Sequence, residues 1–131
     1  MMAVFGTANA AKSTKDVPFT SDYVLKTYAA AITQGNLKGF EKILDNNVIF
    51  TSTRGENVIK IKQEDFLKNL KANEGIKQDC TTTTTLVTET LENTVYELDV
   101  KYADYTSANF ITMVGTDETG WKIIRVNTTI K

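Results

Sequence analysis

The apolar positions of the chain follow a helical spacing first and an alternating spacing later. Between Thr20 and Gly35 they fall at i, i+1, i+4, i+7 and i+8, which places them on one face of a helix. Thr20 can cap the start of this helix, and Gly35 ends it. A similar spacing predicts a second, short helix over residues 37–44. A third helix contains Phe66 on its inward side and ends near Gly75.

Alternating apolar and polar residues predict strands in the rest of the chain. Residues 48–54 and 58–61 read as a short hairpin whose turn contains Gly55. Four longer strands follow Gly75, beginning at Thr81, near Tyr96, near Ser107 and at Trp121, and joined by short turns. Helices followed by an antiparallel meander predict an α+β fold.

The run of five threonines from Thr81 to Thr85 has two interpretations. It could be a low-complexity linker, but it leads directly into Leu86 and Val87, and threonine is a β-branched residue that favours strands. We therefore expect a long, half-exposed strand here.

Composition excludes several classes of protein. The chain has 131 residues, enough for one domain, and its 15 Lys plus Arg nearly balance its 16 Asp plus Glu. This balance argues against a nucleic-acid partner held by a basic surface. The absence of histidine removes Ser-His and Cys-His catalytic pairs, and the single Cys80 excludes an intramolecular disulfide or a multi-cysteine zinc site. No apolar run approaches the roughly 20 residues of a membrane span, and no motif indicates a metal or a cofactor.

The first 19 residues differ from the domain predicted over residues 20–131. Residues 1–11 (MMAVFGTANAA) are small or apolar and include an Ala-x-Ala pattern at Ala8 to Ala10. This resembles the end of a secretory signal peptide without its basic front part. We expect export to the periplasm; the alternatives are a frayed terminus and a cytoplasmic protein.

Three segments resemble the nuclear transport factor 2-like superfamily, also called cystatin-like. They are YAAAITQGN at residues 28–36, LKGFEKILDNNVIF at residues 37–50 and GWKI at residues 120–123. The chain is most similar to small bacterial members classed as SnoaL-like or lumazine-binding. The resemblance implies three N-terminal helices packed in the concave face of a strongly curved, mainly antiparallel sheet. It also implies a ligand pocket inside this cone and a homodimer formed through the outer face of the sheet.

The same resemblance bears on catalysis. Ketosteroid isomerases of this fold place a carboxylate base where Ser52 aligns in this chain, and other enzymes of the fold rely on histidine. A serine of ordinary acidity does not abstract a proton from carbon. An isomerase or lyase acting on a carbonyl or polycyclic substrate would need a buried acid, for which the sequence offers Glu41, Glu64 or Asp65.

Arg54 and Arg125 are the only arginines, and both lie in predicted strands. Arg54 is expected to share a face with Phe50 and Ser52, and Arg125 to share one with Trp121 and Ile123. If they point into the cone, they would hold an anionic or carbonyl-bearing ligand. The alternatives are an ion pair with an acid of the third helix and exposure at a strand end.

Aromatic residues complete the candidate pocket. Tyr28, Tyr102 and Trp121 combine an apolar body with a polar tip, which suits a pocket wall, although most buried aromatic residues only fill a core. The full set of candidate ligand-binding residues is Tyr28, Phe50, Ser52, Arg54, Tyr102, Trp121 and Arg125.

Other polar residues are not expected in the pocket. Glu97, Asp99 and Lys101 alternate with the apolar face of their strand and are expected on the outer surface. Cys80 reads as a buried or edge thiol.

These observations favour a non-catalytic protein that binds a small organic ligand. The alternatives are the lyase or isomerase and a protein-interaction module that uses the outer face of the sheet.

Overall fold

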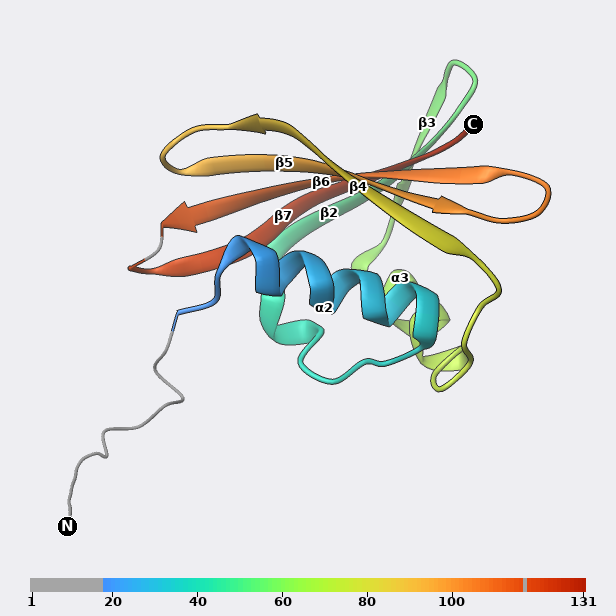
Figure 1. The fold of residues 1–131 in the computed structure, drawn as a ribbon, viewed down its shortest axis with the longest axis horizontal. Coiled ribbons are helices and arrows are strands. Elements are labelled where there is room, and N and C mark those ends of the chain that lie inside the picture. The colour runs from blue at the N-terminus through green and yellow to red at the C-terminus, as the bar shows by residue number, and fades with distance from the viewer. Residues whose placement is uncertain (1–17, 117) are drawn as a thin grey trace, which may run out of the picture.

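The computed structural model describes residues 18–116 and 118–131. The signal-like residues 1–11 and most of the expected N-terminal segment, 1–19, therefore lie outside the described residues. Within the described part, the elements run in the order α2 (Ser21–Gln34), η2 (Glu41–Ile43), β2 (Leu44–Arg54), β3 (Asn57–Ile61), α3 (Gln63–Ala72), β4 (Thr81–Glu89), β5 (Asn93–Lys101), β6 (Thr106–Thr116) and β7 (Gly120–Ile130). The expected α+β class is confirmed (Figure 1).

Helix α2 begins and ends where its sequence predicts. The side chain of Thr20 accepts a hydrogen bond from the backbone N–H of Tyr23 at 3.0 Å, which satisfies one of the free amides at the start of the helix. At the other end Gly35 takes a left-handed conformation, with φ of 66°, and caps the last turn.

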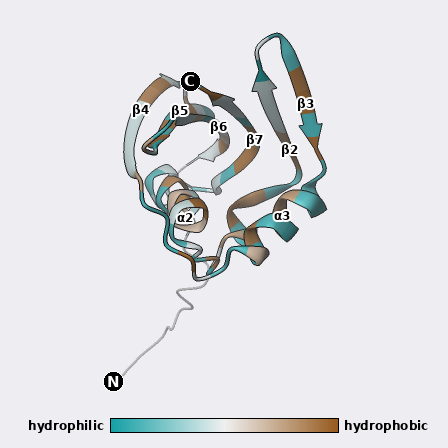
Figure 2. Cartoon of the chain, turned by 90° about the vertical axis from the view of Figure 1, so that its right-hand side faces the viewer, coloured by the Kyte–Doolittle hydropathy of each residue, from teal (hydrophilic) through white to brown (hydrophobic). Residues whose placement is uncertain are grey.

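The six strands that the structure describes form one curved sheet in the order β3-β2-β7-β6-β5-β4. Every neighbouring pair is antiparallel except β2 and β7, which are parallel. Irregularities of register occur in the β2–β7, β4–β5 and β6–β7 pairs, and such bulges bend and twist strands. The sheet curls around α2 and α3, which both lie on its concave side (Figure 2).

The core lies between the helices and this concave face. Its largest fully buried side chains come from both layers and include Tyr28, Phe40, Phe50, Ile43, Leu98, Ile111, Met113 and Ile123. Phe50 of β2 stacks on Phe66 of α3 with ring centroids 3.8 Å apart and an interplanar angle of 7°. This stack fixes α3 against the sheet.

The expected second helix over residues 37–44 is wrong. The segment makes only the short 3₁₀ turn η2, and β2 already begins at Leu44. Gly39 has φ of 75°, a conformation outside the helical range, so a regular helix cannot pass through it. The apolar residues of the segment, Phe40 and Ile43, are buried by this turn instead.

Strand β4 forms as expected, but it is exposed on both faces rather than half-exposed. Within residues 18–116 and 118–131 it is an edge strand that pairs only with β5, and its side chains are exposed along its whole length. None of the helices in the described part of the chain is both long and apolar enough to cross a bilayer.

Candidate functional site

A cavity of about 290 Å³ lies between the two helices and the concave face of the sheet. The hollow is partly open to solvent. It lies beside the C-terminal half of α2 and the C-terminal end of β5. Its apolar walls are Ile32, Ile61, Phe66, Leu70 and Val100, and its polar walls are Tyr28, Asn69, Asn73, Tyr102, Ser107, Asn109 and Thr128.

The polar walls carry hydroxyl and amide groups only. Among the described residues that line the cavity, none is an Asp, Glu, Lys or Arg. The cavity therefore combines apolar contact with hydrogen bonding, and its lining contributes no formal charge at neutral pH.

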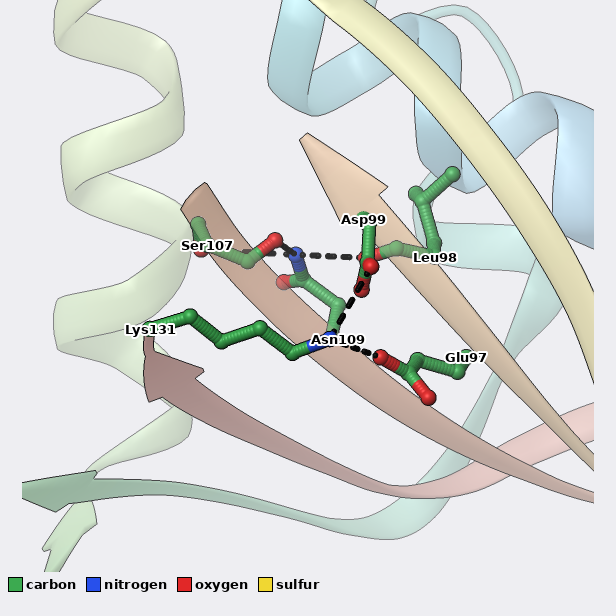
Figure 3. A network of polar contacts seen from close by, with 6 residues as sticks. All are labelled: Glu97, Leu98, Asp99, Ser107, Asn109 and Lys131. Carbon is green, nitrogen blue, oxygen red and sulfur yellow. Dashed lines mark hydrogen bonds and ion pairs between the residues drawn. The ribbon is translucent and has the colours of Figure 1, made fainter. Parts of the chain in front are cut away.

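Asn109 is the centre of a buried polar network at the inner end of the cavity. It is only 4% exposed, and its Oδ1 accepts hydrogen bonds from Tyr28 Oη at 3.3 Å and from Thr128 Oγ1 at 3.2 Å. Its Nδ2 donates to the carbonyl oxygens of Leu98 at 3.2 Å and Ser107 at 3.3 Å (Figure 3). The network links α2 to β5, β6 and β7.

Burial raises the pKa of Tyr28 well above its ordinary value, because ionisation would leave a phenolate without solvent. The side chain is only 1% exposed. Tyr28 therefore remains a neutral phenol at physiological pH.

Tyr102 also lines the cavity and directly follows the end of β5. Its hydroxyl donates to Gln78 Oε1, and its ring stacks on Tyr105 with centroids 4.9 Å apart. Its pKa is raised by partial burial and, secondarily, by the neighbouring acidic groups of Cys80 and Tyr105.

Two of the seven candidate residues, Tyr28 and Tyr102, are thus brought together in the cavity. Phe50 lies behind the wall, stacked on the lining residue Phe66. Ser52 lies on the inward side of β2 opposite Thr128 of β7, half-buried and outside the described lining.

Trp121 belongs to another part of the molecule. It is 6% exposed and lies beside Ser21 at the start of α2 and Leu91 in the β4–β5 turn. It therefore packs near the opposite end of α2 from the cavity.

The expectation that Arg125 points into the cone is wrong. Met113 pairs with Ile123 and the adjacent Thr112 pairs with Arg125, so Ile124 is an extra residue in β7. This bulge reverses the alternation, and Arg125 is exposed on the outer face while Ile123 is fully buried.

Arg54 does not enter the cavity either. It is the last residue of β2, and it is exposed beside the β2–β3 turn. Exposure at a strand end, one of the two alternatives for this residue, is what the structure shows.

The three acids considered for catalysis also lie elsewhere. Glu41, Glu64 and Asp65 are all exposed, and none is in the lining of the described cavity. Across residues 18–116 and 118–131, no group of three His, Cys, Asp or Glu side chains is arranged to hold a metal ion.

Glu97 and Asp99 lie on the outer side of β5, where their alternation placed them. Lys131 Nζ bridges them, at 2.9 Å from Glu97 Oε2 and 3.1 Å from Asp99 Oδ2 (Figure 3). The contacts raise the pKa of Lys131. This ion-paired cluster faces away from the cavity.

Sequence reasoning missed Asn109, Ser107 and Thr128. Asn109 had a detectable signal, since it alternates onto the same face as Ile111 and Met113, and an amide on an apolar face needs buried partners. The partners themselves, Tyr28 and Thr128, are not detectable from the sequence because they come from distant elements.

No protein-family model matches the sequence, and no curated protein matches it either. Several solved structures, however, are similar to the structure of this chain. An NTF2-like protein of unknown function from Silicibacter pomeroyi has a TM-score of 0.67 at 14% identity, covering 84% of this chain and 92% of that one. An NTF2-like protein of unknown function in nutrient uptake from Rhodospirillum rubrum has a TM-score of 0.63 at 16% identity, with 86% and 98% covered.

A ketosteroid isomerase-like protein from Erwinia carotovora has a TM-score of 0.60 at 7% identity, covering 83% of this chain and 92% of that one. At these identities the similarity concerns the arrangement of the elements. The curved sheet, the helices on its concave side and these neighbours together show that the chain has the nuclear transport factor 2-like fold.

Proposed function

We propose that this chain binds a small organic molecule in the cavity between the helices and the sheet, without catalysing its conversion. The observation that carries this proposal is the lining of the cavity. Apolar walls stand beside the buried hydroxyl of Tyr28 and the hydroxyl of Thr128, both held by the amide of Asn109. Oriented polar groups within an apolar hollow are typical of ligand sites.

The lining supports an uncharged ligand. An anionic ligand was expected on the basis of Arg54 and Arg125, and both of these are exposed outside the cavity. An anion placed against the described lining would lose its hydration without gaining a cationic partner. A carbonyl-bearing ligand would have to take its hydrogen bonds from Ser107 or from the amides of α3.

A lyase or isomerase remains the alternative, and some neighbours of this fold are described as ketosteroid isomerase-like. Proton abstraction requires a base within hydrogen-bond reach of the substrate. The described lining offers Tyr28 and Tyr102, whose raised pKa values make them weaker acids than an ordinary tyrosine and leave them protonated at neutral pH. The lining therefore favours binding over proton transfer.

We also propose that the protein is exported and forms a homodimer through the outer face of the sheet. The first proposal rests on residues 1–11, and the second on the resemblance to dimeric proteins of this fold. Phe110, Val95 and Val114 give this face half-buried apolar surface that a second copy would cover. Use of the same face to bind a different protein is the remaining alternative.

Native mass spectrometry tests the binding proposal and the dimer together. Protein purified gently from a periplasmic extract is expected to have a dimeric mass and to retain a small molecule that is lost on denaturation. Leu70→Trp places an indole in the cavity and should remove the retained mass, because Leu70 is a half-buried wall residue. Lys68→Trp, an exposed position on the same helix, is the matched control.

A wild-type protein that stays free of ligand after exposure to a broad library of uncharged compounds would contradict the binding proposal. Turnover of any bound compound would favour the enzyme alternative.

A further inference from the structure

We propose that the inner end of the cavity selects an uncharged ligand that donates a hydrogen bond, such as an alcohol, a phenol or an N–H group. This inference rests on the proposed binding function and specifies the class of ligand. It follows from the direction of the hydrogen bonds around Asn109.

The orientation of the Asn109 amide is fixed by its surroundings. One end of the amide faces the backbone carbonyl oxygens of Leu98 and Ser107, at 3.2 and 3.3 Å. Carbonyl oxygens only accept hydrogen bonds, so this end must be the nitrogen. The oxygen of Asn109 therefore faces the hydroxyls of Tyr28 and Thr128.

The two hydroxyls must then both donate. A carboxamide oxygen has no hydrogen, so Tyr28 and Thr128 each give their only hydroxyl hydrogen to Asn109. What remains on Tyr28 Oη and Thr128 Oγ1 is lone-pair electrons. Both residues line the cavity, so its inner end presents acceptors.

Tyr102 also lines the cavity and also uses its hydroxyl hydrogen within the protein, since its hydroxyl donates to Gln78 Oε1. Among the described lining residues, the side-chain donors that remain available belong to Ser107, Asn69 and Asn73, whose amide gives one of its two hydrogens to the carbonyl oxygen of Asn69. Ser107 is half-buried and both asparagines are exposed, so water competes for their hydrogen bonds. The buried polar groups that can select between ligands are therefore hydrogen-bond acceptors, and they favour a ligand with a donor group.

A cationic donor fits less well than an uncharged one. No carboxylate lies in the described lining, so an ammonium group would lose its hydration without a counter-charge. A neutral donor meets the acceptors at a much smaller desolvation cost.

Three probes that share one ring system test this inference by calorimetry on the full-length protein. They are 2-naphthol, which donates, 2-methoxynaphthalene, whose ether oxygen only accepts, and 2-acetylnaphthalene, which carries a carbonyl. We expect 2-naphthol to bind about 3- to 10-fold more tightly than the other two, the effect of one hydrogen bond in a partly buried site.

Two variants test whether the preference for 2-naphthol arises at Tyr28 and Thr128. Tyr28→Phe and Thr128→Val should each weaken 2-naphthol binding and leave 2-methoxynaphthalene binding unchanged. Tyr23→Phe, an exposed tyrosine on the same helix, should change neither. Circular dichroism before each titration confirms that the variants are folded.

Equal affinity for the three probes, or tighter binding of 2-acetylnaphthalene, would overturn the inference and leave the proposed binding function intact. A preference for 2-naphthol that survives both variants would also overturn it. Failure of every probe to bind, together with no retained molecule in the native mass, would contradict the proposed function as well.

Discussion

Tyr28 of α2 and Asn109 of β6 are 81 positions apart in the sequence and share a hydrogen bond of 3.3 Å in the interior. Asn109 has a counterpart on the outer face of the sheet. Asn127 Oδ1 likewise accepts hydrogen bonds from two hydroxyls, those of Thr51 at 2.6 Å and Thr53 at 3.0 Å. The two asparagines differ chiefly in burial, because Asn109 is buried and Asn127 is half-buried.

Asn109 and Asn127 therefore provide a matched test of how much burial of such a hydrogen-bond network contributes to stability. Asn109→Ala leaves the buried Tyr28 hydroxyl without its acceptor, and we expect it to lower the free energy of unfolding by about 2 to 4 kcal/mol. Asn127→Ala should cost less than about 1 kcal/mol, because water can reach the hydroxyls it leaves. Urea denaturation measures both. Equal losses would show that the buried network does not contribute more than the outer one.

The connection that follows α3 packs tightly on the end of α2 at Gly35. A Cβ atom built there would lie 2.5 Å from both the carbonyl oxygen of Asn73 and the backbone nitrogen of Gly75. We expect Gly35→Ala to lower the free energy of unfolding by more than about 2 kcal/mol, since it adds this clash to the cost of a left-handed alanine.

Gly55 is the control for that substitution. It has a similar φ, 61° against 66°, but no atom lies within 4 Å of the added Cβ. Gly55→Ala should therefore show only the conformational cost, about 1 to 2 kcal/mol. A Gly35 variant as stable as the Gly55 variant would mean that the connection shifts away without cost.

The raised pKa of Tyr28 predicts a loss of stability in alkali. Unfolded tyrosine titrates near 10.0, whereas the buried phenol keeps its proton to higher pH. Above pH 10 the unfolded chain thus binds fewer protons than the folded one, and the free energy of unfolding falls by up to about 1.4 kcal/mol per pH unit. The contribution of Tyr28 is fully present below pH 10.

Comparison with Tyr28→Phe isolates this effect from the other titrating groups. The stability difference between wild type and variant should be constant from pH 7 to 9 and should then fall as the pH rises. A difference that stays constant to pH 11 would indicate that the folded phenol ionises as readily as the unfolded one.

The positions of the arginines predict that they do not contribute to ligand retention. Arg54→Ala and Arg125→Ala should keep the retained mass seen in the native spectrum, because both side chains are exposed outside the cavity. Leu70→Trp, in contrast, should remove the retained mass. Loss of the retained ligand in the Arg125→Ala variant would instead support the anionic ligand expected from the sequence.

The sequence determined the elements whose signals are local. Thr20 and Gly35 bound α2 because caps act within one turn, and alternating residues predicted β5 because a strand exposes successive side chains to opposite faces. The order of these elements was enough to predict the class of fold. Residues 37–44 show the limit of such signals, because their apolar spacing permits a helix, whereas in the structure Gly39 has a positive φ and only a 3₁₀ turn forms.

Tertiary structure decided the site. The one-residue bulge at Ile124 turned Arg125 outward, and spacing along the chain does not reveal a bulge, because its cause lies in the pairing of β7 with β6. Tyr28, Asn109 and Thr128 meet only because the sheet curls around α2. Period and capping are properties of neighbouring residues, whereas a cavity depends on contacts between distant ones, so the sequence determined the strands and the folded chain decided what they enclose.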